Sequence, residues 1–377
     1  MGGKRYSMKR VCCFCETWES GGIESFLCNV ISNIDLSDIE IDIVASQLKK
    51  SVFTEVLTGL GVCFYELSGN QKNIIENYRC FKRILKRRKY DVFHLNAFQG
   101  MSLYYLYLAK RLGVSVRIAH SHNTDIRQSL TRRIKMCIHR WYSNHYTTYA
   151  TELWACSKSA ADFMFPIKML NNMGYTFVPN GINTSKFKFD FSKRNTARKE
   201  LGLSEKFVIG NVGRLCYQKN QSFLLDVLKE VLERKKDSIL LLVGEGEDKL
   251  ILQEKAKSLG IEEYVIFYGV TDTVEKLFCA MDVFAFPSLF EGLGIVAIEA
   301  QASGLPVIAS EHVPDEANII PIFQKVPLKK ELWAEKILST NSVENRMGLC
   351  NVIYKKGFDI KDVSTLIKKK FFNQKLC

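Results

Sequence analysis

The 377-residue sequence predicts an α/β protein of two domains, each built around a parallel sheet. Short β-rich runs alternate with helical patterns along most of the chain, which is typical of β-α-β units. A polar stretch at Asn183–Glu200, rich in Lys, Asn and Ser, separates two comparable halves. Two such halves predict a cleft between them, where ligands usually bind.

Apolar runs of four to seven residues mark the expected strands. In the first half they are Arg10–Cys15, Ile41–Ala45, Val62–Leu67, Asp91–Leu95, Val116–His120, Glu152–Cys156 and Thr176–Pro179. In the second half they are Lys206–Val212, Ile239–Val243, Val265–Tyr268, Asp282–Phe286 and Pro306–Ala309. We therefore expect domains at residues 1–182 and 183–357, followed by an amphipathic terminal helix at 358–377.

Composition indicates an ordinary globular protein, with 47% hydrophobic and 25% charged residues. No apolar run approaches the ~18 residues of a membrane span, and the apolar run near the N-terminus is too short for a signal peptide. The twelve cysteines are scattered, which suits a reducing compartment, so we expect a cytoplasmic protein. Cys12 and Cys15 form a C-x-x-C inside an apparent buried strand, where core packing is a better explanation than zinc or redox chemistry.

Positive charge is concentrated in the first half. The net charge is +13, and residues 79–140 alone hold 15 basic and two acidic residues. Two stretches, Arg79–Lys89 and Arg132–Tyr142, mix basic and apolar residues at helical spacing, which suits an anionic membrane surface. A solvated basic face is the alternative. Nucleic acid is a weaker option because no recognition motif accompanies the charge.

The segment Glu291–Gly304 is the most informative in the chain. It lies between two expected strands, and its helix should begin near Gly294 and stop at Gly304. In a parallel α/β sheet this helix N-terminus opens at the carboxyl end of the strands and attracts anions. Glu299 on the helix suits a ribose diol, and Glu291 in the loop could accept hydrogen bonds from sugar hydroxyls.

Other strand ends carry further polar groups. Arg214 and Lys219 follow the first strand of the second half, where two cations can bind a diphosphate. Gly21 and Gly22 follow the first strand of the chain and would let backbone N–H groups approach a phosphate, although a plain turn explains them equally well. The sequence has no Asp-x-Asp pair, no Walker lysine loop and no G-x-G-x-x-G after the first strand. We therefore expect no metal and no cofactor.

Two histidines end a first-half strand. His120 and His122 fall on one face of that strand, and either could be the site histidine. A structural role is the alternative for both.

Taken together, these motifs and Pro179-Asn-Gly-Ile182 resemble glycosyltransferase family 4, from about residue 10 to 310. The similarity is greatest to glycosyltransferases of bacterial capsular and exopolysaccharide clusters. The resemblance implies two Rossmann-like domains facing across a cleft, the GT-B fold, and a retaining reaction. It also implies that the terminal helix packs on the first domain, which would bind the acceptor.

The resemblance assigns a role to each matching residue. Arg214 and Lys219 would bind the donor diphosphate and stabilise its charge as it leaves, and Glu299 would hold the ribose. His122 would lie close to the sugar and acceptor, followed by Asn123 where the family usually has Asp. The remaining donor contacts would come from the Gly21–Gly22 loop and from Glu291 with the backbone of Gly292, Leu293, Gly294 and Ile295.

The expected function is transfer of a hexose or N-acetylhexosamine from a nucleotide diphosphate sugar, a UDP-sugar in the first instance. The acceptor would be a hydroxyl of a lipid-linked surface glycan at the inner face of the cytoplasmic membrane. A GDP-mannose-type mannosyltransferase is the alternative within the same fold. A noncatalytic nucleotide-sugar-binding partner subunit and a sugar-nucleotide epimerase are the alternatives of other classes.

Overall fold

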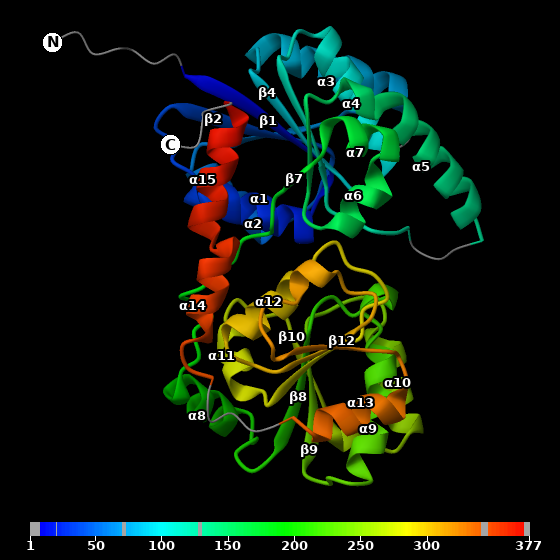
Figure 1. The fold of residues 1–377 in the computed structure, drawn as a ribbon, viewed down its shortest axis with the longest axis vertical. Coiled ribbons are helices and arrows are strands. Elements are labelled where there is room, and N and C mark those ends of the chain that lie inside the picture. Colours follow the sequence, from blue (N-terminus) through cyan, green and yellow to red (C-terminus); the bar gives the residue numbers. More distant parts are fainter. Residues whose placement is uncertain (1–7, 20, 70–72, 127–129, 341–345, 373–377) are drawn as a thin grey trace, which may run out of the picture. The chain divides into compact units, whose positions relative to one another are not determined.

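A computed structural model describes residues 8–19, 21–69, 73–126, 130–340 and 346–372 (Figure 1). The chain forms two compact units. Unit 1 comprises Met1–Gly181 and Ile360–Cys377, and unit 2 comprises Ile182–Asp359. Both ends of the chain therefore belong to the same unit.

Unit 1 contains a seven-stranded, fully parallel sheet with the order β3-β2-β1-β4-β5-β6-β7. Each strand overlaps one of the runs that the sequence predicts. Their bounds are β1 (Lys9–Trp18), β2 (Ile39–Leu48), β3 (Cys63–Glu66), β4 (Val92–Ala97), β5 (Val116–Ser121), β6 (Glu152–Ala155) and β7 (Thr176–Phe177). Cys12, Cys13 and Cys15 are buried on β1, as a core role requires.

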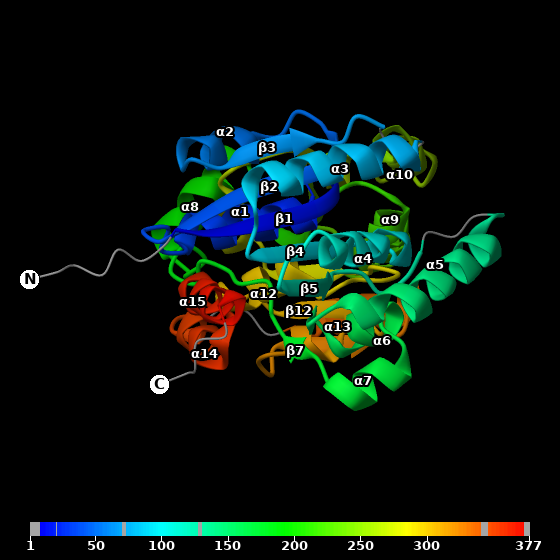
Figure 2. The same cartoon turned by 90° about the horizontal axis from the view of Figure 1, so that it is seen from above.

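Helices cover both faces of this sheet, with α1 and α15 on one face and α3, α4 and α5 on the other (Figures 1 and 2). The helices of unit 1 are α1 (Gly22–Asn33), α2 (Val52–Gly59), α3 (Ile74–Arg88), α4 (Tyr104–Arg111), α5 (Arg132–Tyr146), α6 (Lys158–Met164), α7 (Ile167–Met173) and α15 (Ile360–Phe371). Short 3₁₀ turns lie at η1 (Gly100–Leu103) and η2 (Thr147–Tyr149). The two basic stretches of the sequence are α3 and α5.

The terminal helix α15 completes the core of unit 1. Ile360, Val363, Ile367 and Phe371 are buried in the same apolar cluster as residues of β1 and β2. The Phe371 ring stacks on Trp154 of β6 with 5.8 Å between ring centroids. The helix begins at Ile360 rather than at residue 358 because Gly357, with φ of 81°, ends the preceding helical turn. Residues 373–377 of the expected helix lie outside the described residues.

Unit 2 contains a six-stranded parallel sheet with the order β10-β9-β8-β11-β12-β13. Its strands are β8 (Phe207–Val212), β9 (Ser238–Val243), β10 (Val265–Gly269), β11 (Val283–Phe286), β12 (Val307–Ser310) and β13 (Phe323–Val326). The first five match predicted runs, whereas β13 was not anticipated. In both sheets the order reverses beside the first strand, between β1 and β4 and between β8 and β11, and ligands bind outside the carboxyl ends at such points.

The helices of unit 2 are α8 (Phe191–Glu200), α9 (Gln221–Leu232), α10 (Lys249–Ser258), α11 (Val274–Ala280), α12 (Ile295–Ala302), α13 (Lys330–Leu338) and α14 (Leu349–Ile353). Of these, α9 to α12 connect consecutive strands, whereas α8 precedes β8 and α13 and α14 follow β13. Helix α8 lies within the polar stretch that the sequence marks only as a boundary. Its N-terminus is capped by Asp190, whose side chain accepts a hydrogen bond from the backbone of Lys193 at 3.0 Å.

We expect Phe371→Ala to destabilise unit 1 strongly, because it leaves a cavity beneath Trp154. Replacing a buried Phe by Ala costs about 3–5 kcal/mol. Urea unfolding followed by tryptophan fluorescence measures the loss. The control is Thr365→Ala on the exposed face of the same helix, which should change the midpoint little. Equal midpoints for both variants would contradict a core role for α15.

Candidate active site

The predicted strand–loop–helix segment is present in unit 2. Gly294 is the N-cap of α12 and has φ of 85°. A larger residue would be unfavourable here, because its Cβ would lie 3.0 Å from the Phe286 ring. The helix ends before Gly304, which also has a positive φ. Leu293 is buried beneath the turn. With Gly294 as N-cap, α12 begins at Ile295, and its first backbone N–H groups lie at the carboxyl edge of the sheet.

Lys219 and Glu291 meet at this edge. The Lys219 ammonium lies 2.6 Å from Oε1 of Glu291, and both side chains are largely buried. The same ammonium lies 5.1 Å from the centre of the Phe286 ring. Two hydrogen bonds join their loops: Gln218 Nε2 donates to Phe290 O at 2.9 Å, and Leu289 N donates to Gln218 O at 2.8 Å. The sequence predicted both residues for the site but not their direct contact.

Arg214 has a different environment. Its side chain is 65% exposed and its Nε lies 3.0 Å from Oε2 of Glu247. Its loop is held by Leu215 N, which donates to Glu245 O at 3.0 Å. Gly246 permits this approach, because a Cβ there would lie 2.2 Å from Leu215 O. Glu247 was not identified from the sequence, although its Gly-Glu-Gly-Glu run directly follows β9.

Glu299 is half-buried on α12, and none of the described residues hydrogen-bonds its carboxyl. Burial raises its pKa to about 8; the positive charge of Lys186 opposes this shift and the negative charge of Glu275 adds to it. Lys186 itself lies 3.4 Å from Oε2 of Glu275 and donates to Asp272 O at 3.2 Å. Glu299 thus keeps its acceptor capacity for a ligand. No pattern in the sequence indicates that Lys186 or Glu275 lies near Glu299.

In unit 1, His122 is held by a neighbouring amide. Its Nε2 lies 3.0 Å from Oδ1 of Asn96, whose Nδ2 donates to the backbone oxygens of Phe14 and His94. Because Asn96 therefore presents its oxygen to His122, Nε2 carries the proton. The other ring nitrogen, Nδ1, has no hydrogen-bond partner among the described residues. Burial lowers the pKa of His122 to about 3, so the ring is neutral at physiological pH.

His120 lies deeper than His122. It is fully buried, and its Nδ1 lies 3.1 Å from Nε2 of His94. Burial is the main cause that places its pKa well below the usual value. Asn123 is also buried, and its amide donates to Asp125 O at 2.6 Å, which fixes the following loop. The half-buried His122 is therefore the more accessible of the two predicted histidines.

The Gly21–Gly22 turn starts α1, but the structure adds a carboxylate to it. A Cβ on Gly21 would lie 2.6 Å from Oε2 of Glu24, whereas Gly22 has open space around it. Burial raises the pKa of Glu24, and backbone N–H groups of Glu19, Gly21 and Glu24 that donate to it oppose the shift. An anion that approaches this helix N-terminus therefore competes with Glu24.

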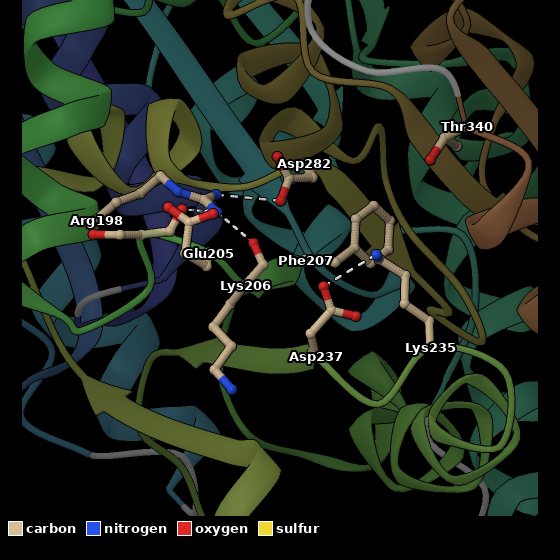
Figure 3. A pocket seen from close by; sticks show the side chains of 9 residues that line it. Arg198, Glu205, Lys206, Phe207, Lys235, Asp237, Asp282 and Thr340 are labelled. Atoms are coloured by element: carbon tan, nitrogen blue, oxygen red, sulfur yellow. Dashed lines mark hydrogen bonds and ion pairs between the residues drawn. The ribbon is translucent and has the colours of Figure 1, made fainter.

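A cavity of about 270 Å³ in unit 2 lies away from these groups (Figure 3). Its lining residues Lys206, Asp237 and Asp282 directly precede β8, β9 and β11, so it is at the amino ends of the strands. Arg198 there is bound to Asp282 and to backbone oxygens. Arg198 therefore has a structural role: it links α8 to the segment before β11. Among the described residues, no group of three or more His, Cys, Asp or Glu side chains is placed to hold a metal ion.

Comparison with known families gives two matches in sequence. Residues 20–186 match the model "Glycosyltransferase Family 4", and residues 193–322 match "Glycosyl transferases group 1". Putative glycosyltransferase EpsF of Bacillus subtilis is 29% identical over 88% of this chain and 87% of its own. The Anabaena protein HepE, solved with UDP and glucose, shares the fold with a TM-score of 0.77 at 18% identity, covering 96% of this chain and 98% of HepE.

Two other relatives carry names that specify a donor. An Escherichia coli UDP-Gal:α-D-GlcNAc-diphosphoundecaprenol α-1,3-galactosyltransferase is 27% identical over 64% of this chain and 62% of its own. A GDP-mannose-dependent α-(1-6)-phosphatidylinositol monomannoside mannosyltransferase of Mycolicibacterium smegmatis is 31% identical over 54% of both chains.

Two Rossmann-like units and these matches define a glycosyltransferase of the GT-B fold. Within that class, the chain belongs to glycosyltransferase family 4.

The raised pKa of Glu299 predicts a pH-dependent stability. Its folded-state pKa of about 8 exceeds the ordinary 4.5, so the folded protein retains a proton that the unfolded chain releases. Stability is therefore lost as pH rises from about 5 to about 8. Glu299→Gln removes this loss, and its gain in stability over wild type should grow across that range and then level off.

Urea unfolding of wild type and variant at several pH values measures this difference. The control is Glu331→Gln on α13, whose side chain is 65% exposed; it should give a constant difference. A constant difference for Glu299→Gln as well would show that Glu299 is not the titrating group.

Proposed function

We propose that this protein is a retaining glycosyltransferase that moves a hexose or N-acetylhexosamine from a UDP-sugar to a lipid-linked surface-polysaccharide acceptor. The observation that carries the proposal is the Lys219–Glu291 pair beside the N-terminus of α12. At one sheet edge this pair combines a cation and a carboxylate with the first turn of a helix. A nucleotide diphosphate sugar needs these groups for its phosphates and its sugar hydroxyls.

Lys219 and Arg214 neutralise the diphosphate as it leaves, which is the charge that grows in the transition state. Both cations already have carboxylate partners, Glu291 and Glu247. When the donor binds, its phosphates therefore pair with these two cations in place of part of the carboxylate contacts. The Glu291 carboxylate then becomes available to accept hydrogen bonds from the sugar hydroxyls. With two cations and the helix N-terminus in these roles, the reaction requires no metal and no cofactor.

Glu299 holds the ribose diol, because it lies on α12 and its carboxyl has no hydrogen bond from the described residues. The two hydroxyls donate to the ionised form, so nucleotide binding lowers its raised pKa.

The transfer itself exchanges one bond at the anomeric carbon for another. The bond to the diphosphate oxygen breaks, the bond to the acceptor oxygen forms on the same face, and the acceptor proton passes to the departing diphosphate. His122 is neutral, and its Nδ1 is buried with no hydrogen-bond partner among the described residues, so a hydroxyl that reaches it satisfies an unpaired acceptor. It therefore orients a hydroxyl of the sugar or acceptor, and Asn96 keeps it in this tautomer.

A GDP-mannose-type mannosyltransferase is the second candidate. The mycobacterial relative favours it by its named donor, as the E. coli relative favours UDP. The named acceptors of both relatives are lipid-linked, which supports a similar acceptor here.

The basic face of unit 1 supports a peripheral position on the inner face of the cytoplasmic membrane. On α5, Ile134, Ile138 and Trp141 are exposed at helical spacing, between the exposed cations Arg133, Lys135 and Arg140. Such a helix lies in the interface of an anionic bilayer. None of the helices in the described part of the chain has the length and apolar composition of a membrane span.

Lys219→Ala and Arg214→Ala should each lower the transfer rate, by roughly 10²–10³-fold for the buried Lys219, a magnitude seen when one charge-stabilising group is removed. The assay uses labelled UDP-sugars, GDP-mannose as the rival donor and an undecaprenyl-diphosphate sugar acceptor. EDTA should leave the rate unchanged. Lys235→Ala, at the opposite edge of unit 2, is the matched control. A divalent-metal requirement, or full activity of Lys219→Ala, would refute this assignment.

Membrane attachment is measured by flotation with vesicles. The wild type should float with vesicles that contain phosphatidylglycerol and not with neutral ones, because the basic residues contribute about 1 kcal/mol each. The double variant Ile134→Ser/Trp141→Ser should lose most of this recovery. Leu250→Ser/Ile251→Ser removes two exposed apolar residues from α10 and should have no effect. Equal recovery with neutral and anionic vesicles would exclude the electrostatic attachment.

A further inference from the structure

Unit 1 contains a cavity of about 190 Å³. None of the site residues described above lines it. It opens at the reversal of strand order, because its floor combines Glu16 of β1 with Gln99 and Ser102, which follow β4. Its walls come from α3, α4 and α5. The lining residues used below are Glu16, Asn77, Tyr78, Tyr104, Tyr105 and Tyr142, and we call this cavity the tyrosine pocket.

The floor of the tyrosine pocket is rigid. Burial raises the pKa of the Glu16 carboxyl, and four groups donate to it: the Ser102 hydroxyl, the backbone N–H groups of Gln99 and Phe98, and the Gln99 side chain. Four donors fill the acceptor sites of a carboxylate. Glu16 therefore fixes the loop after β4 and acts as a positioning residue.

The walls present phenol rings with available hydroxyls. The Tyr105 hydroxyl is not available to a ligand, because it forms a hydrogen bond with the Ser46 side chain. The hydroxyls of Tyr78, Tyr104 and Tyr142 have no hydrogen-bond partner among the described residues. The rings of Tyr104 and Tyr142 pack against the Tyr146 ring, with centroid distances of 5.1 and 5.4 Å. The pocket thus offers flat apolar faces that carry unpaired hydroxyls.

This combination fits a sugar ring. The C–H face of a pyranose packs on phenol rings, and its hydroxyls pair with the phenol hydroxyls. Asn77 completes the wall, where its Oδ1 accepts a hydrogen bond from Gly69 N at 2.9 Å. A lipid tail would leave these hydroxyls unpaired, which is unfavourable. The volume is below the ~300–1,000 Å³ of pockets that hold drug-sized ligands, so it suits a single ring and excludes a nucleotide.

The charged and apolar residues around the tyrosine pocket indicate which kind of sugar it binds. Two of its walls, α3 and α5, are the basic helices, and Ile74 and Met101 at its lining are exposed apolar residues. A sugar that is linked to a phosphorylated lipid would meet cations and apolar surface where it leaves the pocket. We propose that the tyrosine pocket binds the terminal monosaccharide of the acceptor. This inference rests on the proposed function, in which unit 1 receives a lipid-linked glycan.

The test removes three hydroxyls and keeps the rings, in the triple variant Tyr78→Phe/Tyr104→Phe/Tyr142→Phe. Tyr146→Phe removes a hydroxyl from the same aromatic cluster outside the pocket and is the matched control. The probes are the methyl glycosides of glucose, galactose, mannose and N-acetylglucosamine, detected by saturation-transfer NMR on the full chain. UDP and GDP binding and the melting temperature are measured on the same samples.

At least one glycoside should bind to wild type and to Tyr146→Phe. The triple variant should bind it at least tenfold more weakly, since each lost hydrogen bond contributes ~1 kcal/mol, with unchanged melting and nucleotide binding. Absence of glycoside binding to wild type, or equal binding to the triple variant, would overturn the pocket assignment. Glycoside binding that requires these hydroxyls, in a protein that binds neither UDP nor GDP, would support the pocket and reject the proposed donor site.

Discussion

Parallel strand pairing is the constraint on which the candidate site depends. Because every strand of a sheet points the same way, the loops that follow the strands gather at one edge. In unit 2 this brings the loop after β8, with Lys219, to the loop after β11, with Glu291. In unit 1 it places Asn96 of β4 beside His122, which follows β5. Strand pairing alone therefore brings together residues that are far apart in the sequence and belong to no common sequence motif.

The ionisable side chains at these edges differ in whether an oppositely charged side chain lies next to them. Lys219 and Glu291 compensate each other, as two buried charges must. None of the described cations forms an ion pair with Glu299, and burial favours its protonated form. Hydrogen bonds donated to this carboxyl by a bound group would stabilise its ionised form and so offset the effect of burial.

The sequence predicted the sheets well because buried parallel strands are continuous apolar runs. Strand β13 was missed because Gln324 and Lys325 interrupt its two buried residues, and α8 because a polar helix resembles a linker. The position of Lys219, Glu291 and His122 after strands could be predicted, since spacing fixes which edge of a parallel sheet they share. The partners of the site residues could not: Glu247 for Arg214, Lys186 and Glu275 near Glu299, and Asn96 for His122 depend on contacts between distant loops.

The return of α15 to unit 1 has a consequence for folding during synthesis. Domains usually fold from the N-terminus as they emerge from the ribosome. Here unit 1 begins before unit 2 but lacks Ile367 and Phe371 until the segment that follows unit 2 is made. Unit 2 has all its residues earlier, and its two ends are joined where Ile182 N donates to Phe358 O at 2.8 Å. The second unit in sequence can therefore be the first to finish folding, while the nascent first unit waits with an uncovered apolar face.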